Sequence, residues 1–102
     1  MSRRRLDDDE IEAVLATHRA WRREGEHLVR VVALRSYQEG VGLVVAQAEV
    51  AERLDHHATL TLGYDELRFE VWTHDRGGIT DRDVEFVDEV DRLVALTVES
   101  AG

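Results

Sequence analysis

The first apolar pattern along the chain is helical. Within residues 6–21, Ile11, Val14 and Leu15 recur at the spacing of one helix face. The four acids at positions 7–10 lie where the positive end of a helix dipole favours negative charge. We therefore predict a first helix in this segment.

Two short strands are expected next. A turn signal at residues 24–26 precedes a run rich in valine and leucine at residues 27–34, which predicts a strand buried in part on both faces. A short strand at residues 21–23 is placed to pair with it across the turn. An antiparallel hairpin therefore follows the first helix.

The longest predicted element is a helix at residues 36–54. Ser36 and Glu39 have the spacing of a capping box, in which the hydroxyl and the carboxylate each satisfy a free backbone N–H of the first turn. Gly40 and Gly42 each cost this helix up to about 1 kcal/mol relative to alanine, so we expect close packing there against the sheet or a second subunit. Its predicted inner face consists of apolar residues at helical spacing: Val41, Val44, Val45, Ala48, Ala51 and Leu54.

A second hairpin is predicted before the last helix. Residues 59–62 and 67–73 flank a short turn, and in the second segment Phe69 and Val71 alternate with polar neighbours. That period of two gives the second strand one buried face. His74 lies at the end of this strand, on the parity away from Phe69.

The chain then breaks at Gly77 and Gly78, and Thr80 with Asp83 begins a last helix in a capping-box-like pattern. The predicted inner face of this helix contains Val84, Val87, Val90 or Asp91, and Val94. The element order is α-β-β-α-β-β-α. Strand pairs joined by short turns predict an α+β fold, with an antiparallel sheet that carries its helices on one face.

The composition fits one small globular domain. The 102 residues suffice for a single domain spanning residues 1–102 and are too few for two. The chain has no cysteine, which excludes disulfides, thiolate catalysis and zinc bound by cysteine. No apolar run reaches the roughly 18 residues that a membrane span needs, and no signal-peptide pattern follows the basic start of the chain. We therefore expect a cytoplasmic protein without a membrane partner.

The charge of the chain is strongly acidic. A formal net charge of −9 repels phosphate backbones, so we expect no nucleic-acid partner. A short basic cluster lies at Arg3, Arg4 and Arg5. We interpret residues 1–5 as a disordered tail rather than as a binding arm.

Three of the five histidines lie where a site can form. His56 and His57 are adjacent at a helix-to-strand junction, and His74 ends a strand that should return beside that junction. Histidine has an unperturbed pKa of about 6.5, which suits proton donation and acceptance near neutral pH. Glu52 lies one helical turn before His56, so its carboxylate can reach that ring if the helix continues.

Other residues near the histidines allow more than one interpretation. Asp55 and Asp75 flank the histidines and could orient them. An adjacent histidine pair is also compatible with simple solvation, and Trp21 with a place in the core rather than at a substrate. A metal site built from the pair is not expected, because adjacent side chains leave an extended chain in opposite directions. We assign no role to His18 or His27.

Two motifs together resemble the signature of the pterin-4a-carbinolamine dehydratases. The motifs are ERLDHH at residues 52–57 and THDRGGIT at residues 73–80, with Asp83 downstream. Trp21 and Tyr64 match two aromatic residues of that family. The spacing between the motifs agrees without a gap, and the resemblance covers nearly the whole chain.

The resemblance implies a fold and an activity. Members have a four-stranded antiparallel sheet with three helices on one side, and commonly form homodimers or homotetramers. They are hydro-lyases that dehydrate 4a-hydroxytetrahydropterin to quinonoid dihydropterin, which recycles the pterin cofactor of aromatic amino acid hydroxylases. They need no metal and no organic cofactor.

The resemblance also implies roles for individual residues. His56 and His74 would act as acid and base, while His57 would position the pterin substrate. The supporting or substrate-binding residues would be Glu52, Asp55, Asp75, Asp83 and Trp21.

One position departs from the family pattern. The family's proline after the histidine pair is Ala58 here. Proline fixes its own φ and restricts the residue before it, so its absence leaves His57 less constrained. We expect weaker preorganisation of the site rather than its loss.

Two further functions stay open beside catalysis. Some proteins with this family's fold look to have been reused as transcription-factor dimerisation partners and as assembly factors for carboxysomal Rubisco. A non-catalytic binding or assembly module is therefore one alternative. A domain that senses a pterin without converting it is the other. The presence of all three histidines favours catalysis.

Overall fold

The computed structural model describes residues 4–99, which form one sheet and the helices that cover it. The elements are α1 (Asp8–Thr17), β1 (Trp21–Glu24), β2 (His27–Ala33), α2 (Tyr37–Leu54), β3 (Thr59–Leu62), β4 (Glu66–Val71), the 3-10 turn η1 (His74–Arg76) and α3 (Asp81–Leu96). The sheet order is β1-β2-β4-β3, and every neighbouring pair is antiparallel. The predicted α+β fold and element order are confirmed, and η1 is an addition to them.

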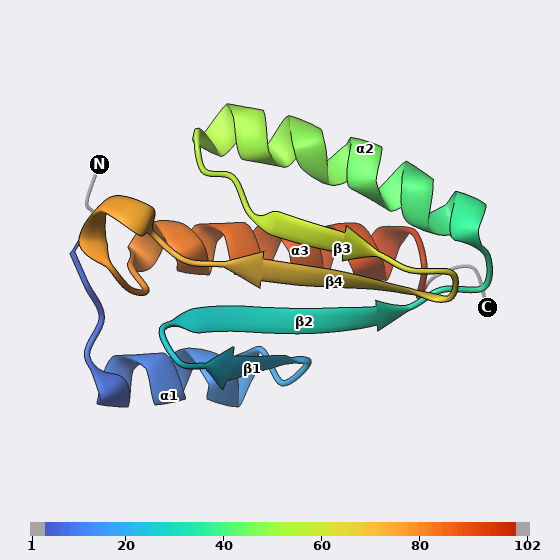
Figure 1. The fold of residues 1–102 in the computed structure, drawn as a ribbon. Coiled ribbons are helices and arrows are strands. Elements are labelled where there is room, and N and C mark those ends of the chain that lie inside the picture. Colours follow the sequence, from blue (N-terminus) through green and yellow to red (C-terminus); the bar gives the residue numbers. More distant parts are fainter. Residues whose placement is uncertain (1–3, 100–102) are drawn as a thin grey trace.

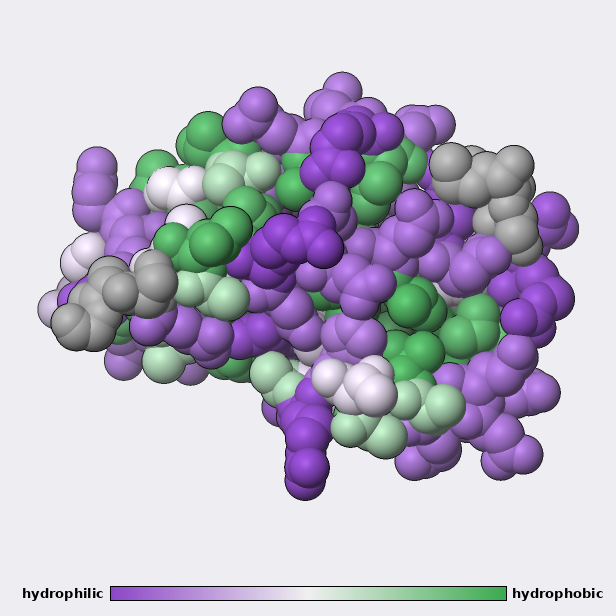
Figure 2. All heavy atoms as spheres, turned by 180° about the vertical axis from the view of Figure 1, so that it is seen from behind, coloured by the Kyte–Doolittle hydropathy of each residue, from purple (hydrophilic) through white to green (hydrophobic). Residues whose placement is uncertain are grey.

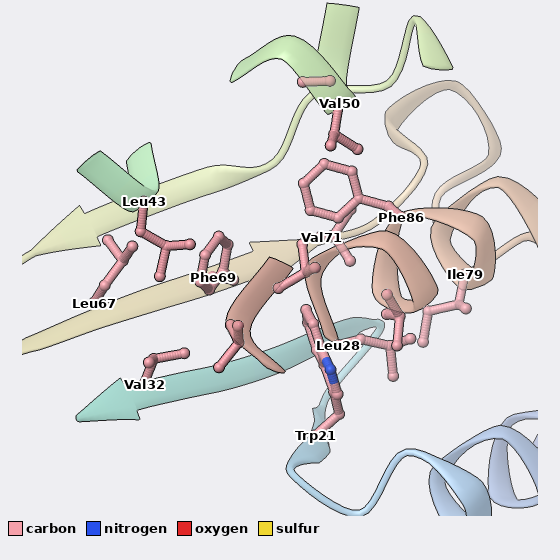
Figure 3. Packing of buried hydrophobic residues seen from close by; sticks show 14 of the residues in the cluster. Trp21, Leu28, Val32, Leu43, Val50, Leu67, Phe69, Val71, Ile79 and Phe86 are labelled. Atoms are coloured by element: carbon pink, nitrogen blue, oxygen red, sulfur yellow. The ribbon is translucent and has the colours of Figure 1, made fainter. Parts of the chain in front are cut away.

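The core lies between the sheet and its helices. Figure 1 shows α3 behind the strands, α2 beside β3 and α1 beside β1. Side chains that alternate along β2 and β4, such as Leu28 and Phe69, meet Phe86 from α3 and Val50 from α2 (Figure 3). Phe69 and Phe86 are completely buried. The predicted alternation of the second hairpin is therefore confirmed.

The face of the sheet opposite the helices is not uniformly exposed to solvent. Val29 lies on the parity away from the helices and is nevertheless fully buried. Its neighbour on the same face, Val31, is 38% exposed. The expectation that β2 is buried in part on both faces is confirmed.

The inner face of α2 differs from the predicted one. The residues of α2 that are buried are Gly40, Leu43, Gln47, Val50 and Ala51. Val45, which was expected inside, is 62% exposed, and Ala48 is exposed as well. The helix is thus rotated by about one residue position from the expected orientation.

The expectation of a homodimer or homotetramer stays a prediction.

Gly40 explains this rotation. A Cβ atom at this position would lie 2.5 Å from Cδ1 of Leu62 and 2.6 Å from Cδ1 of Leu34. The absence of a Cβ at Gly40 lets α2 pack against these two leucines without displacing them, and the glycine side of the helix faces inward. A Cβ at Gly42 would meet no atom within 4 Å. The predicted close approach to the sheet is therefore confirmed at Gly40.

The helix starts agree only in part with the sequence pattern. The Thr80–Asp83 capping box of α3 is complete, as predicted. At α2 the Ser36 hydroxyl accepts from the Glu39 N–H at 3.1 Å, but the Glu39 carboxylate accepts from the Arg35 N–H and guanidinium instead of from Ser36. The prediction of a full box at Ser36 is therefore wrong, because the neighbouring arginine takes the carboxylate.

The start of the described chain is held against the loop before α3. Leu6 N donates to Ile79 O at 2.9 Å, and Arg5 forms an isolated β-bridge with Thr80. Arg5 also pairs with Glu26 at 2.5 Å. The expectation of a disordered tail is thus wrong for residues 4 and 5, while residues 1–3 lie outside the described part.

The surface that carries the helices is mainly hydrophilic. Figure 2 shows this side with small hydrophobic patches between polar side chains. Across residues 4–99, none of the helices combines the length and the apolar character needed to cross a membrane.

A complete capping box also begins α1, and it gives a first prediction. The Arg4 guanidinium donates to both carboxylate oxygens of Glu10, at 2.9 and 2.8 Å, and the Asp7 N–H donates to the same carboxylate. These contacts lower the pKa of Glu10 from 4.5 to about 2. The resulting stabilisation is present above the unfolded-state pKa and is lost as the pH falls through the folded-state value.

We expect Glu10→Gln to be less stable than the parent protein at pH 7, because glutamine keeps the capping box but not the ion pair. The difference in free energy of unfolding, measured with urea, should shrink as the pH falls from 4.5 towards 2. Glu12→Gln, on the exposed side of the same helix, is the control. A difference that stays constant over this pH range would contradict the assignment.

Candidate active site

The histidine pair follows a sharp reversal at the end of α2. Asp55 adopts a left-handed conformation with φ 50° and ψ 46°, the one positive φ of a non-glycine residue in residues 4–99. The His56 N–H donates to Ala51 O and the Asp55 N–H to Glu52 O, which is the hydrogen-bond pattern of a Schellman motif. Aspartate tolerates this conformation better than most residues. The turn separates the directions of the two imidazoles.

Arg82 holds this turn from the opposite side. Its guanidinium donates to Leu54 O and, at 3.0 Å, to Asp55 O, although the residue is only 7% exposed. These carbonyls end α2 and would otherwise lack partners. Sequence reasoning missed Arg82, because a basic residue in the first turn of α3 gives no sign of what it contacts.

His56 is bound by the buried carboxylate of Asp83. The Nε2 atom of His56 lies 2.5 Å from Oδ1 of Asp83, which has no exposed surface. The other oxygen of Asp83 accepts from the Thr73 hydroxyl and the Thr80 N–H, both at 2.8 Å. Every oxygen of this carboxylate therefore has a donor. The network fixes the His56 ring at the junction of α2, β4 and α3.

His57 is held differently. Its Nε2 lies 2.5 Å from Oε2 of Glu52, and both side chains are largely exposed. The expectation that Glu52 would reach His56 is therefore wrong. The helix ends at Leu54, and the left-handed turn carries His56 away from Glu52 and brings His57 to it.

A short loop presents His74. The Thr73 N–H donates to Gly78 O at 2.9 Å, which closes the loop that contains η1, and Gly77 allows the reversal with φ 64°. Thr73 is buried and also shares a 2.7 Å contact between its hydroxyl and that of Thr80. His74 is consequently exposed at the tip of a loop whose base belongs to the Asp83 network.

These segments surround one pocket of about 260 Å³. It is lined by Asp55, His56, His57, Thr73, His74 and Asp75. The structure thus brings together the three predicted histidines and the two flanking aspartates. Asp83 lies behind this surface in contact with His56, and Glu52 contacts His57.

Two aromatic rings adjoin His74 outside the pocket lining. Trp72 lies 4.3 Å from the His74 ring between centroids, and His27 stacks on Trp72 at 3.7 Å with planes 10° apart. The Nδ1 atom of His27 pairs with the Glu70 carboxylate. His27, to which no role was assigned, therefore contacts the surroundings of the site. No sequence signal pointed to His27, because its place opposite Trp72 follows from the register between β2 and β4.

Trp21 does not reach the pocket. It is 4% exposed, packs against Phe69 and donates from Nε1 to Asp91 at 2.7 Å. Asp91 also pairs with the buried Arg30 at 2.5 Å. Of the two interpretations left open for Trp21, the structure places it in the core. Within residues 4–99, no group of three or more histidine, aspartate or glutamate side chains has an arrangement suited to a metal ion.

Comparisons with known proteins agree on one family. The family model described as pterin 4 alpha carbinolamine dehydratase matches residues 4–93. A protein of Natronomonas pharaonis, provisionally named a pterin-4-alpha-carbinolamine dehydratase, is 43% identical over 89 residues, which cover 87% of this chain and 95% of that protein. A protein of Streptomyces coelicolor with the same provisional name is 41% identical over 91 residues, covering 88% and 90% of the two chains.

Two solved structures share the fold. A transcriptional coactivator/pterin dehydratase from Brucella melitensis superposes with a TM-score of 0.84 at 23% identity, covering 88% of this chain and 98% of its own. A pterin dehydratase-like protein identified as a RuBisCO assembly factor in the alpha-carboxysome has a TM-score of 0.61 at 22% identity, with 72% and 88% covered. At these identities the likeness concerns the fold alone.

The buried Asp83 network gives a second prediction. Asp83→Asn places an NH₂ group either against the Thr80 N–H, which can only donate, or against the His56 ring, which would have to change tautomer to accept. We expect the free energy of unfolding, measured with urea at pH 7, to fall by about 1–3 kcal/mol. Glu85→Gln makes the same chemical change on the exposed side of α3 and should change it by less than about 0.5 kcal/mol. Equal stability of Asp83→Asn and the parent protein would contradict this description of the network.

Proposed function

This chain belongs to the pterin-4a-carbinolamine dehydratase family, and from that membership we propose that it dehydrates a 4a-hydroxytetrahydropterin. The product is the quinonoid dihydropterin. The observation that carries the proposal is the convergence of three imidazoles on one pocket. Membership supports the reaction class, and the pocket supplies the groups that this class requires.

The reaction needs a proton moved at each of two places. The C4a–O bond breaks and the hydroxyl leaves as water once it has accepted a proton. The electron pair of the N5–H bond forms the C4a=N5 double bond, and the N5 proton passes to a base. One acid and one base on the same pocket therefore suffice, and neither an oxidant nor a reductant is consumed.

His56 is suited to the role of base. Its Nε2 is occupied by Asp83, so the other ring nitrogen, Nδ1, is the one available to a substrate. The Asp83 carboxylate fixes the ring and balances the positive charge that forms when the ring takes a proton, as the aspartate of a hydrolase triad does for its histidine. Because both partners are buried, this orientation is kept before the substrate arrives.

His74 and His57 take the remaining roles. His74 lies exposed at the pocket, so it can donate a proton to the leaving hydroxyl and recover one from water. His57, paired with Glu52, contributes a donor at the pocket wall that holds the pterin. General acid–base catalysis of this kind typically accelerates a reaction by about 10²–10⁴-fold.

A non-catalytic binding or assembly role is the second candidate. It is supported by the shared fold with the RuBisCO assembly factor and by Ala58 at the family's proline position. A protein that only binds a partner has no requirement for a fully bonded His–Asp pair beside two further imidazoles. The site therefore favours the enzymatic proposal.

Direct assay separates these candidates. We expect the parent protein to accelerate dehydration of 4a-hydroxytetrahydropterin, generated by an aromatic amino acid hydroxylase and followed by absorbance. His56→Ala and His74→Ala should each lower kcat by about 10²-fold or more. His18→Gln changes an imidazole outside the pocket and should keep the parental rate. Dehydration no faster with the parent protein than without it would refute the proposal.

The alanine after the histidine pair gives a separate prediction. Within residues 4–99 the Ala58 N–H makes no hydrogen bond, so proline removes none there. We expect Ala58→Pro to stabilise the protein by about 0.4–1 kcal/mol, because proline lowers the conformational entropy of the unfolded chain. We also expect it to raise kcat, because proline restricts the backbone conformation of His57. Ala58→Gly should act in the opposite direction. Unchanged turnover and unchanged stability in Ala58→Pro would show that preorganisation at this position is already complete.

A further inference from the structure

The three pocket histidines differ in what holds their rings. His56 is bound by Asp83 and His57 by Glu52, each at 2.5 Å. The ring of His74 makes no hydrogen bond and no ion pair with any residue of the part described, 4–99. Its interaction is the contact with the indole of Trp72, at 4.3 Å between centroids and 39° between planes. An exposed imidazole held in no other way depends on this contact for its orientation.

Trp72 is itself held by a second ring. The pairing of Leu28 with Val71 places His27 and Trp72 at neighbouring positions of β2 and of the chain just after β4. The two rings stack at 3.7 Å with planes only 10° apart. Parallel aromatic rings at this separation attract one another beyond the area that they bury. His27 therefore fixes the plane of the indole.

The stack ends on an anchor in the sheet. The Nδ1 atom of His27 pairs with the carboxylate of Glu70, which lies two residues before Trp72 on the same face. Glu70 also lies 3.7 Å from the Arg68 guanidinium. A hydrogen bond at one ring nitrogen fixes the orientation of the His27 ring and also which nitrogen carries the proton. The order of contacts runs from Glu70 through His27 and Trp72 to His74.

We propose that Trp72 and His27 are positioning residues that set the orientation of the His74 imidazole. The catalytic part of this inference rests on the proposed function, in which His74 exchanges a proton with the substrate. Neither Trp72 nor His27 lines the pocket, so neither is assigned a contact with the pterin. Their effect should therefore appear in the rate of the chemical step rather than in substrate binding.

The contact between His74 and Trp72 can be measured without any substrate. The ring protons of His74, identified by their loss in His74→Gln, should be shifted upfield by the ring current of Trp72 in a ¹H–¹³C NMR spectrum of the full chain. Trp72→Leu should remove the shift and Trp72→Phe should keep part of it. His27→Gln should reduce it, because the indole loses its stacked ring. Val31→Ala, on the same face of β2 outside the stack, is the control. His74 resonances that are the same in the parent protein and in Trp72→Leu would overturn the proposal.

Kinetics test the consequence for catalysis. We expect Trp72→Leu to lower kcat roughly tenfold and to change KM by less than about twofold, because a misplaced catalytic group slows the chemical step without weakening binding. Trp72→Phe should recover most of the lost rate. His27→Gln should show a smaller loss with the same pattern. A parental kcat in Trp72→Leu, or a loss seen in KM alone, would refute the positioning role.

Failure of this inference is distinguishable from failure of the proposed function. An inactive parent protein with the upfield shift of His74 present would refute the proposed reaction and would support the contact between Trp72 and His74. An active parent protein, a loss of activity in His74→Ala and no effect of Trp72→Leu would support the reaction and refute the positioning role.

Discussion

The rest of the site depends on one buried carboxylate. Asp83 has no exposed surface, so the free energy lost on removing it from water has to be recovered from hydrogen bonds. Those bonds come from the Thr80 backbone, the Thr73 hydroxyl and the His56 ring, which belong to the start of α3, the segment after β4 and the end of α2. The same side chain completes the capping box of α3. A requirement of local helix geometry and a requirement of the pocket are therefore met by a single residue.

The features that the sequence could predict are those decided by residues close together in the chain. The Thr80–Asp83 capping box involves residues three positions apart. The parity that buries Phe69 and turns His74 away from it follows from the pleat of one strand. The element order follows from apolar periodicity for the same reason. The meeting of His74 with the histidine pair was inferred from strand return and from two motifs whose spacing resembled a known family.

The features that escaped prediction depend on contacts between distant segments. The rotation of α2 is decided by the fit of Gly40 against Leu62, which the run of valines in that helix does not reveal. The partner of Glu52 is decided by a left-handed aspartate, a conformation that no glycine signalled, and by Arg82 arriving from α3. In each case the local sequence pattern was compatible with two arrangements, and a contact between distant segments selected one of them.

The uneven exposure of the pocket histidines has a consequence for how bulk solvent reaches each ring. Only 10% of the His56 side chain is exposed, whereas 58% of the His57 side chain is. Because His56 lines the pocket, an occupant of the pocket shields its ring from bulk solvent. In the proposed reaction, exchange of protons between His56 and bulk water would therefore wait until the ligand has left the pocket.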